Sequence, residues 1–303
     1  MVEDINTGSV YAGESVRNVY TRNLKEARKM MHNEVQIIKR IQDHHHIVKA
    51  HATHIATRGL AIFLSPVADM GDLASYLQDR RDTMMSGKDF AEPDEILQRS
   101  LGCLASGLAY IHDQTVRHKD IKPQNILIHK GEVIFTDFGI SHDFGDAGQS
   151  TTTGPVQGLT RRYCAPEVDE GRSRNSSSDI CSLGCVYLEF VDSLYAGVFE
   201  EDLLAGSFHE KLLTLETVFW TRPERNWNPA LGVLKGLLCH ESSKKPSATE
   251  VVCHWINAFA FAGALPNPYF FALEQGTCIV IANEPTRTCR LDVHVNLSGH
   301  TTS

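Results

Sequence analysis

The sequence has no long hydrophobic run and no excess of positive charge. No stretch approaches the roughly 20 apolar residues that span a bilayer, and the acidic start, Met1-Val2-Glu3-Asp4, lacks the apolar segment of a secretory signal. The formal net charge of the 303 residues is −8. That charge argues against a mainly electrostatic hold on nucleic acid or on an anionic membrane, so we expect neither as a partner.

Paired cysteines are also missing. The eight cysteines include no C-x-x-C pair and are scattered through apolar segments. This pattern is typical of reduced, mostly buried thiols, so we expect an intracellular protein of the cytoplasm or nucleus. A hydrophobic content of 42% and a charged content of 22% are those of an ordinary globular protein, long enough for one two-lobed domain or two modest ones.

Two neighbouring acidic motifs stand at the centre of the chain, Arg117–Asn125 and Asp137-Phe138-Gly139. The apolar segments between them, Ile126–Ile128 and Val133–Phe135, predict two short strands joined by a turn at His129–Gly131. A hairpin this short returns the second motif to the side of the first.

The hairpin therefore predicts a magnesium site. It brings the Asp137 carboxylate beside the amide oxygen of Asn125, and Mg²⁺ prefers one or two such hard oxygen ligands together with phosphates and water. Asp120, held apart from that pair in the same loop, is free to orient a hydroxyl nucleophile.

These motifs resemble those of the eukaryotic-type protein kinases. The catalytic loop His-Arg-Asp-Leu-x-x-x-Asn stands here as His118–Asn125, Asp-Phe-Gly is intact at Asp137–Gly139, and Ala-Pro-Glu is intact at Ala165–Glu167. The resemblance covers about residues 8–260. It implies an α+β, two-lobed protein kinase-like fold with a small β-rich N-lobe (1–64, with no counterpart to the first strand) and a mainly helical C-lobe (65–262). The match fades in the tail (263–303), which we expect to be partly ordered at best.

The resemblance also implies ATP and Mg²⁺ as cofactors, with a protein that offers a serine or threonine hydroxyl as substrate. Asp120 would be the catalytic aspartate, and Asn125 and Asp137 would hold the metal. Lys122, two residues after Asp120, marks serine/threonine specificity, and Thr160 matches the threonine that bonds the catalytic aspartate and lysine.

The nucleotide-binding part is less complete. Gly8 and Val10 resemble the last glycine and the valine of the family's glycine-rich loop, although Gly8 also suits a plain turn residue. Ser65 and Val67 lie in the expected hinge, whose backbone would bond the adenine edge. Asp72 is placed either to reach the ribose or to cap the helix that follows it.

The phosphate-binding lysine of the family has no counterpart, because Asn23 stands where it belongs. In that strand the side chain of Arg22 would point to the face opposite that of Asn23. Lys25 would share the face of Asn23, but it lies beyond the expected end of the strand. The next segment, 24–42, has helical periodicity and carries Glu34, which is either the glutamate that normally pairs with this lysine or an exposed helix residue.

Several replacements mark the C-lobe. Lys119 replaces the arginine that grips an activation-segment phosphate, so control through the hydroxyl-rich tract Ser150–Pro155 would be weaker, and that tract also suits a plain polar loop. Lys245 replaces the arginine that pairs with Glu167 and predicts a weaker, monodentate bridge. Asp179 would accept hydrogen bonds from catalytic-loop amides.

Three functions are compatible with this pattern. An active serine/threonine kinase uses all the catalytic-loop residues. A pseudokinase, which binds partners or nucleotide without useful turnover, would account for the missing lysine. A small-molecule phosphotransferase would share the Asp…Asn…Asp arrangement but lacks the Lys-Pro-Gln, Asp-Phe-Gly and Ala-Pro-Glu segments, and ranks last.

Overall fold

The structure is a computed structural model of the whole chain. It describes residues 1–16, 24–56, 59–86, 94–139, 141–143, 160–171, 175–194, 205–212, 214–215, 217, 228–261, 271–274, 277–280 and 288–290. All structural statements below concern these residues.

The N-terminal part is a four-stranded antiparallel sheet with one long helix, α1 (Leu24–Ile41). The strands lie in the order β1-β2-β4-β3. They comprise β1 (Val2–Glu3), β2 (Val10–Val16), β3 (Lys49–Ile55) and β4 (Leu60–Ser65). The helix packs against β3 and β4 through apolar residues that recur at helical spacing, among them Met31, Ile38 and Ile41.

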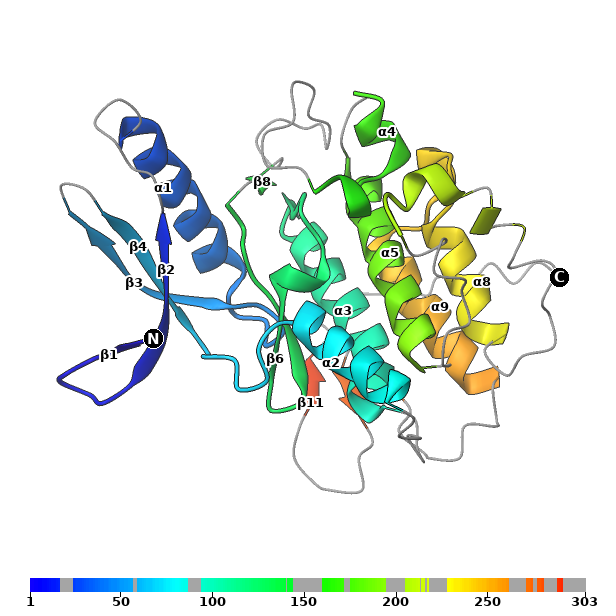
Figure 1. The fold of residues 1–303 in the computed structure, drawn as a ribbon, viewed down its shortest axis with the longest axis horizontal. Helices are drawn as coiled ribbons and strands as arrows, with labels where there is room; N and C mark the ends of the chain where they lie inside the picture. Colours follow the sequence, from blue (N-terminus) through cyan, green and yellow to red (C-terminus); the bar gives the residue numbers. More distant parts are fainter. Residues whose placement is uncertain are drawn as a thin grey trace, which may run out of the picture.

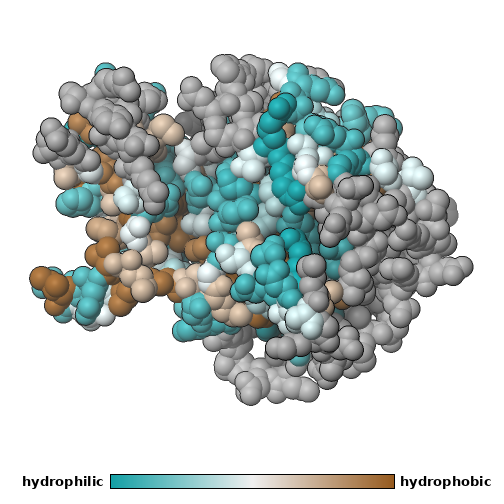
Figure 2. Space-filling model, in the orientation of Figure 1, coloured by the Kyte–Doolittle hydropathy of each residue, from teal (hydrophilic) through white to brown (hydrophobic). Residues whose placement is uncertain are grey.

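The N-terminal part also carries exposed apolar side chains. Val2, Val10 and Ile55 are all more than 40% exposed, and Figure 2 shows hydrophobic surface gathered over the sheet end of the molecule. The described surface of the helical end is mostly hydrophilic in the same view.

The remainder is mainly helical (Figure 1). Its helices are α2 (Leu73–Met85), α3 (Glu95–Asp113), α4 (Pro166–Asp169), α5 (Ser176–Leu194), α8 (Asn228–Leu237) and α9 (Ala248–Phe261). Helix α3 begins after Asp94, whose carboxylate accepts a hydrogen bond from the N–H of Leu97. The predicted stripe on this helix is confirmed as core, since Leu97, Leu101, Leu104, Leu108 and Ile111 are all buried.

Short strands and 3₁₀ turns carry the loops between these helices. The pairs are β5 (Val116–Arg117) with β8 (His142–Asp143), and β6 (Ile126–His129) with β7 (Glu132–Phe135). The 3₁₀ turns are Pro123–Asn125, Arg161–Tyr163, His209–Lys211 and Ser242–Lys244. The predicted hairpin is therefore confirmed, with its turn at Lys130 and Gly131, where both backbones have positive φ as a tight two-residue turn requires.

The hairpin is hydrogen-bonded to the N-terminal part. Phe135 donates its N–H to the carbonyl of His46 and accepts from the N–H of Val48, in the turn that links α1 to β3. On the other strand, Ile128 exchanges backbone hydrogen bonds with Met70 and Gly71, which follow β4. The loops at the base of the hairpin thus lie where the two parts of the molecule meet, and the expected α+β, two-part architecture is confirmed.

Two elements of the structure were not predicted as strands. At the N-terminus, where the sequence predicts no counterpart to the first strand of the family, the two-residue β1 pairs with β2 in the register Val2–Tyr11 and Glu3–Val10, and residues 4–9 connect them. In the tail, where only partial order is expected, the strands β9 (Phe271–Glu274), β10 (Thr277–Val280) and β11 (Thr288–Arg290) form a small antiparallel sheet. Among the described helices, none is both long and apolar enough to cross a bilayer.

Candidate active site

The catalytic loop is held by a hydrogen-bond network around the buried Asp120. The Lys122 ammonium lies 2.5 Å from the Oδ2 of Asp120 and donates to the Oγ1 of Thr160 at 2.9 Å. The lysine thus ties the loop to the segment that precedes Ala165-Pro166-Glu167, as the resemblance implies for Thr160.

Asn125 is oriented by the same aspartate. Its amide nitrogen donates to the backbone carbonyl of Asp120 at 2.9 Å and to Oδ2 of Asp120 at 3.0 Å. Both bonds use the nitrogen, which leaves the amide oxygen available as an acceptor or metal ligand. The backbone carbonyl of Asn125 accepts from the N–H of Thr136 at 3.0 Å, so the residue before Asp137 is bonded to Asn125 itself.

Asp179 anchors the backbone of the catalytic loop. Its buried carboxylate accepts hydrogen bonds from the N–H groups of His118 and Lys119 at 2.9 and 2.8 Å and contacts His112 at 3.0 Å. Burial alone would raise the pKa of Asp179, but the hydrogen bond and charge of His112, with the loop amides, hold that pKa below its usual value. The contact predicted for Asp179 is confirmed.

The Asp-Phe-Gly motif is fixed by packing of its middle residue. The Phe138 ring is fully buried and lies 4.7 Å from the ring of His118, centroid to centroid. The backbone of Asp137 has a φ of 60°, in the left-handed region that a non-glycine residue seldom adopts. Its carboxylate accepts only a long contact, 3.4 Å, from the N–H of Gly139 among the described residues.

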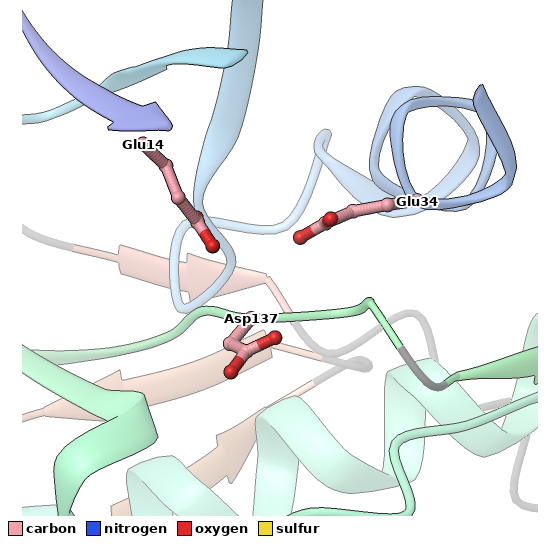
Figure 3. A group of neighbouring side chains, drawn as sticks. All are labelled: Glu14, Glu34 and Asp137. Atoms are coloured by element: carbon pink, nitrogen blue, oxygen red, sulfur yellow. The ribbon is translucent and has the colours of Figure 1, made fainter. Parts of the chain in front are cut away.

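Three carboxylates converge above this motif, as Figure 3 shows. Glu14 comes from β2, Glu34 from α1 and Asp137 from the Asp-Phe-Gly segment, and one oxygen of each lies within 4.8 Å of the others. Glu34 is buried, with 7% exposure, so it is not the exposed helix residue that the sequence left open. Burial, followed by the charges of Glu14 and Asp137, raises the pKa of Glu34 to about 8.

Glu14 was not predicted from the sequence. Its signal is weak, because an acidic residue in an alternating strand usually faces solvent. Only the pairing of β2 with β4, which sets Glu14 opposite Ile62, together with the packing of α1, shows which residues it meets.

The predicted nucleotide residues lie in the N-terminal sheet and in the segment that links it to α2. Gly8, with a φ of 68°, and Val10 lie in the turn and strand that follow β1. Ser65 ends β4, and Val67 follows it, both half-buried. Asp72 caps α2, since its Oδ1 accepts from the N–H of Ser75 at 2.8 Å.

The Asp72 cap allows its two suggested roles to be separated. Asp72→Ala is expected to lower the free energy of unfolding by about 1 kcal/mol, whereas Asp72→Ser keeps a capping oxygen and loses only a few tenths. If the carboxylate also binds the ribose hydroxyls, both variants should weaken Mg-ATP binding equally. Calorimetric titration measures that binding, and urea denaturation measures the change in stability. Wild-type nucleotide affinity in Asp72→Ser would leave the residue as a cap alone.

Several sequence predictions fall outside the described residues. These are the register of Arg22 and Asn23 and the hydroxyl-rich tract Ser150–Pro155. Lys25 is described, and it is exposed on the first turn of α1.

A buried ion pair braces the Ala-Pro-Glu segment. The Lys245 ammonium contacts both carboxylate oxygens of Glu167 at 2.9 Å, with side chains 0% and 5% exposed. The predicted monodentate bridge is therefore wrong: the lysine sits between the two oxygens, a geometry that burial and the hydroxyls of Ser177 and Ser178 support.

Comparison with known proteins agrees with this geometry. Residues 2–256 match the model of the protein kinase domain. The chain is similar to serine/threonine-protein kinase Nek8 of Danio rerio, with 29% identity over 77% of this chain and 31% of that protein. It is also similar to MAP kinase kinase kinase wis4 of Schizosaccharomyces pombe, with 26% identity over 84% of this chain and 18% of that protein. MAP kinase kinase MKK1/SSP32 of Saccharomyces cerevisiae shows 32% identity over 54% of this chain and 33% of that protein. The chain thus spans about a third or less of the length of these curated relatives.

Proposed function

Because this chain belongs to the protein kinase domain family, we propose that it is a serine/threonine protein kinase, which transfers the γ-phosphate of ATP to a hydroxyl of a protein substrate. The observation that carries the proposal is the Asp120–Lys122–Thr160 network, in which the Lys122 ammonium donates hydrogen bonds to both the buried Asp120 carboxylate and the Thr160 hydroxyl. The names of all three relatives include the word kinase, and Nek8 is named as a serine/threonine-protein kinase.

Each residue of the loop has a separate task in this reaction. Asp120 orients the substrate hydroxyl and accepts its proton as the oxygen attacks. Lys122 sits beside that carboxylate, where its charge can offset the negative charge that develops on the transferred group. Asp179 holds the loop backbone in place through two N–H groups, so that Asp120 does not have to reorganise during the reaction.

The residues present fit a magnesium ion and a nucleotide. The amide oxygen of Asn125 and the carboxylate of Asp137 are the hard oxygen ligands that Mg²⁺ prefers, and neither has another strong partner in the described part of the chain. When bound, Mg-ATP supplies the phosphoryl group and the metal neutralises charge on its oxygens. Ser65, Val67 and Asp72 lie beside the same junction and are proposed to hold the adenine and ribose, with Gly8 and Val10 over the phosphates.

The proposal is tested by binding and transfer measured on the same preparation. Mg-ATP is expected to raise the melting temperature of the wild-type protein and to label serine or threonine in a generic protein substrate. Asp137→Asn should lose the magnesium-dependent part of the shift, because it removes the charged ligand. An unchanged shift in that variant would contradict the metal assignment.

The alternative, a kinase-like domain without turnover, makes a different prediction for the same experiment. It predicts a nucleotide-dependent shift, or none, with no labelled product at any enzyme concentration. The intact catalytic-loop network favours the active enzyme over this alternative.

A further inference from the structure

The three carboxylates of Glu14, Glu34 and Asp137 form a cluster that the proposed phosphotransfer does not use as a unit. They come from three separate elements, and in Figure 3 the side chains of Glu14 and Glu34 extend toward each other and toward Asp137. One oxygen of each lies within 4.8 Å of the others. Three acidic groups this close repel one another unless protons or a cation neutralise them.

Glu34 gives an independent indication that a ligand belongs there. Its side chain is buried, with 7% exposure, and its Oε1 has no hydrogen-bond partner among the described residues. A buried carboxylate oxygen without a partner costs free energy, and native proteins rarely leave one in that state. This oxygen belongs to the side chain that Figure 3 shows aimed at Glu14 and Asp137.

No protein cation neutralises the cluster in the described part of the chain. The salt bridges found there do not include Glu14, Glu34 or Asp137. The nearby Lys122 is directed instead to Asp120 and Thr160. Since no side chain there supplies a positive charge, either a proton on Glu34 or an external cation balances the cluster, and a bound cation would take the place of that proton.

We propose that Glu14, Glu34 and Asp137 form a binding site for a hard divalent cation, and that the site fills without nucleotide. An all-oxygen, all-carboxylate donor set selects Ca²⁺, Mg²⁺ or Mn²⁺ over the softer metals. Ca²⁺ bonds oxygen at about 2.3–2.6 Å, so ligands on opposite sides lie up to about 5 Å apart, whereas Mg²⁺ draws them to about 4.2 Å or closer. The three oxygens lie within 4.8 Å of one another, a spacing that the longer Ca²⁺–oxygen bonds accommodate.

This site differs from the one that Asn125 and Asp137 would supply for the nucleotide-bound metal. It shares Asp137 but uses two glutamates from the N-terminal part, and a bound ion would join β2 and α1 to the Asp-Phe-Gly segment. The inference goes beyond the proposed function, since it concerns the nucleotide-free protein and requires no phosphotransfer.

The test is calorimetric titration of CaCl₂, and separately MgCl₂, into chelator-stripped, nucleotide-free protein. We expect saturable binding with Ca²⁺ tighter than Mg²⁺. Glu14→Gln and Glu34→Gln should each weaken Ca²⁺ at least about tenfold, because each removes one of three charged ligands. Glu95→Gln, on the exposed first turn of α3, is the matched control and should bind as the wild type does.

Asn125→Ala separates the two metal sites. It removes the other ligand of the nucleotide-bound metal, so Ca²⁺ binding in the absence of ATP should persist. Glu14 is exposed, so Glu14→Gln can be interpreted even where the buried Glu34→Gln folds poorly. The proposal is overturned if no divalent cation binds without nucleotide, or if Glu14→Gln binds Ca²⁺ as tightly as wild type. Either result would leave the proposed kinase function untouched, because Mg-ATP binding and phosphotransfer are measured in separate experiments.

Discussion

Asp120→Asn should lower the phosphotransfer rate by about 10²- to 10⁴-fold, the range that a positioned general base contributes. The substitution keeps the size of the side chain but removes the carboxylate that accepts the hydroxyl proton. It also leaves the Lys122 ammonium, now 2.5 Å from a carboxylate oxygen, beside a neutral amide. Because the change affects the reacting centre and not the metal ligands, the Mg-ATP melting shift should remain close to that of wild type.

The measurement pairs initial rates of transfer to a generic protein substrate with Mg-ATP thermal shifts. Asp79→Asn is a suitable control: it makes the same chemical change at an exposed position on α2, where Thr83 contacts only the backbone carbonyl of Asp79. If Asp120→Asn and Asp137→Asn lose the melting shift to the same extent, the separation of nucleophile-orienting and metal-binding roles is wrong.

The catalytic centre was predictable because its parts are close in sequence. Asn125, the hairpin and Asp137 occupy one continuous segment, and the two short apolar runs on either side of a turn predict the hairpin to within one residue of β6 and β7. The Asp179 contact was accessible only through the resemblance, since 60 residues separate it from Lys119.

Other features depend on tertiary register, which a sequence pattern does not contain. Strand β1 has only two residues, too few for any periodicity, and it is recognisable only by its pairing with β2. Glu14 could not be predicted as a site residue for the same reason. Its two neighbours come from a helix and from a loop more than a hundred positions away, and only the tertiary structure brings them together. Because Lys245 replaces the arginine of the family, the sequence predicted a weaker bridge to Glu167. The sequence does not show that the Lys245 ammonium is buried between the two carboxylate oxygens of Glu167.

Lys245→Met should lower the free energy of unfolding by about 3–5 kcal/mol, because breaking a buried ion pair leaves one charge without compensation. The ammonium is 0% exposed and contacts both oxygens of Glu167, so water cannot replace it without a rearrangement of the Ala-Pro-Glu segment. Methionine has a similar length and no charge, which limits the loss to electrostatics and hydrogen bonding. Equilibrium denaturation in urea, followed by tryptophan fluorescence, measures the change.

The adjacent lysine supplies the matched control. Lys244 is 65% exposed and pairs with the exposed Glu241, so Lys244→Met should leave the free energy of unfolding nearly unchanged. The double variant Glu167→Gln/Lys245→Met should recover part of the loss, since it removes the stranded carboxylate and keeps an oxygen that accepts from Ser177 and Ser178. Equal effects of Lys244→Met and Lys245→Met would contradict the assignment of a buried brace, because the two substitutions differ chiefly in the burial of the charge they remove.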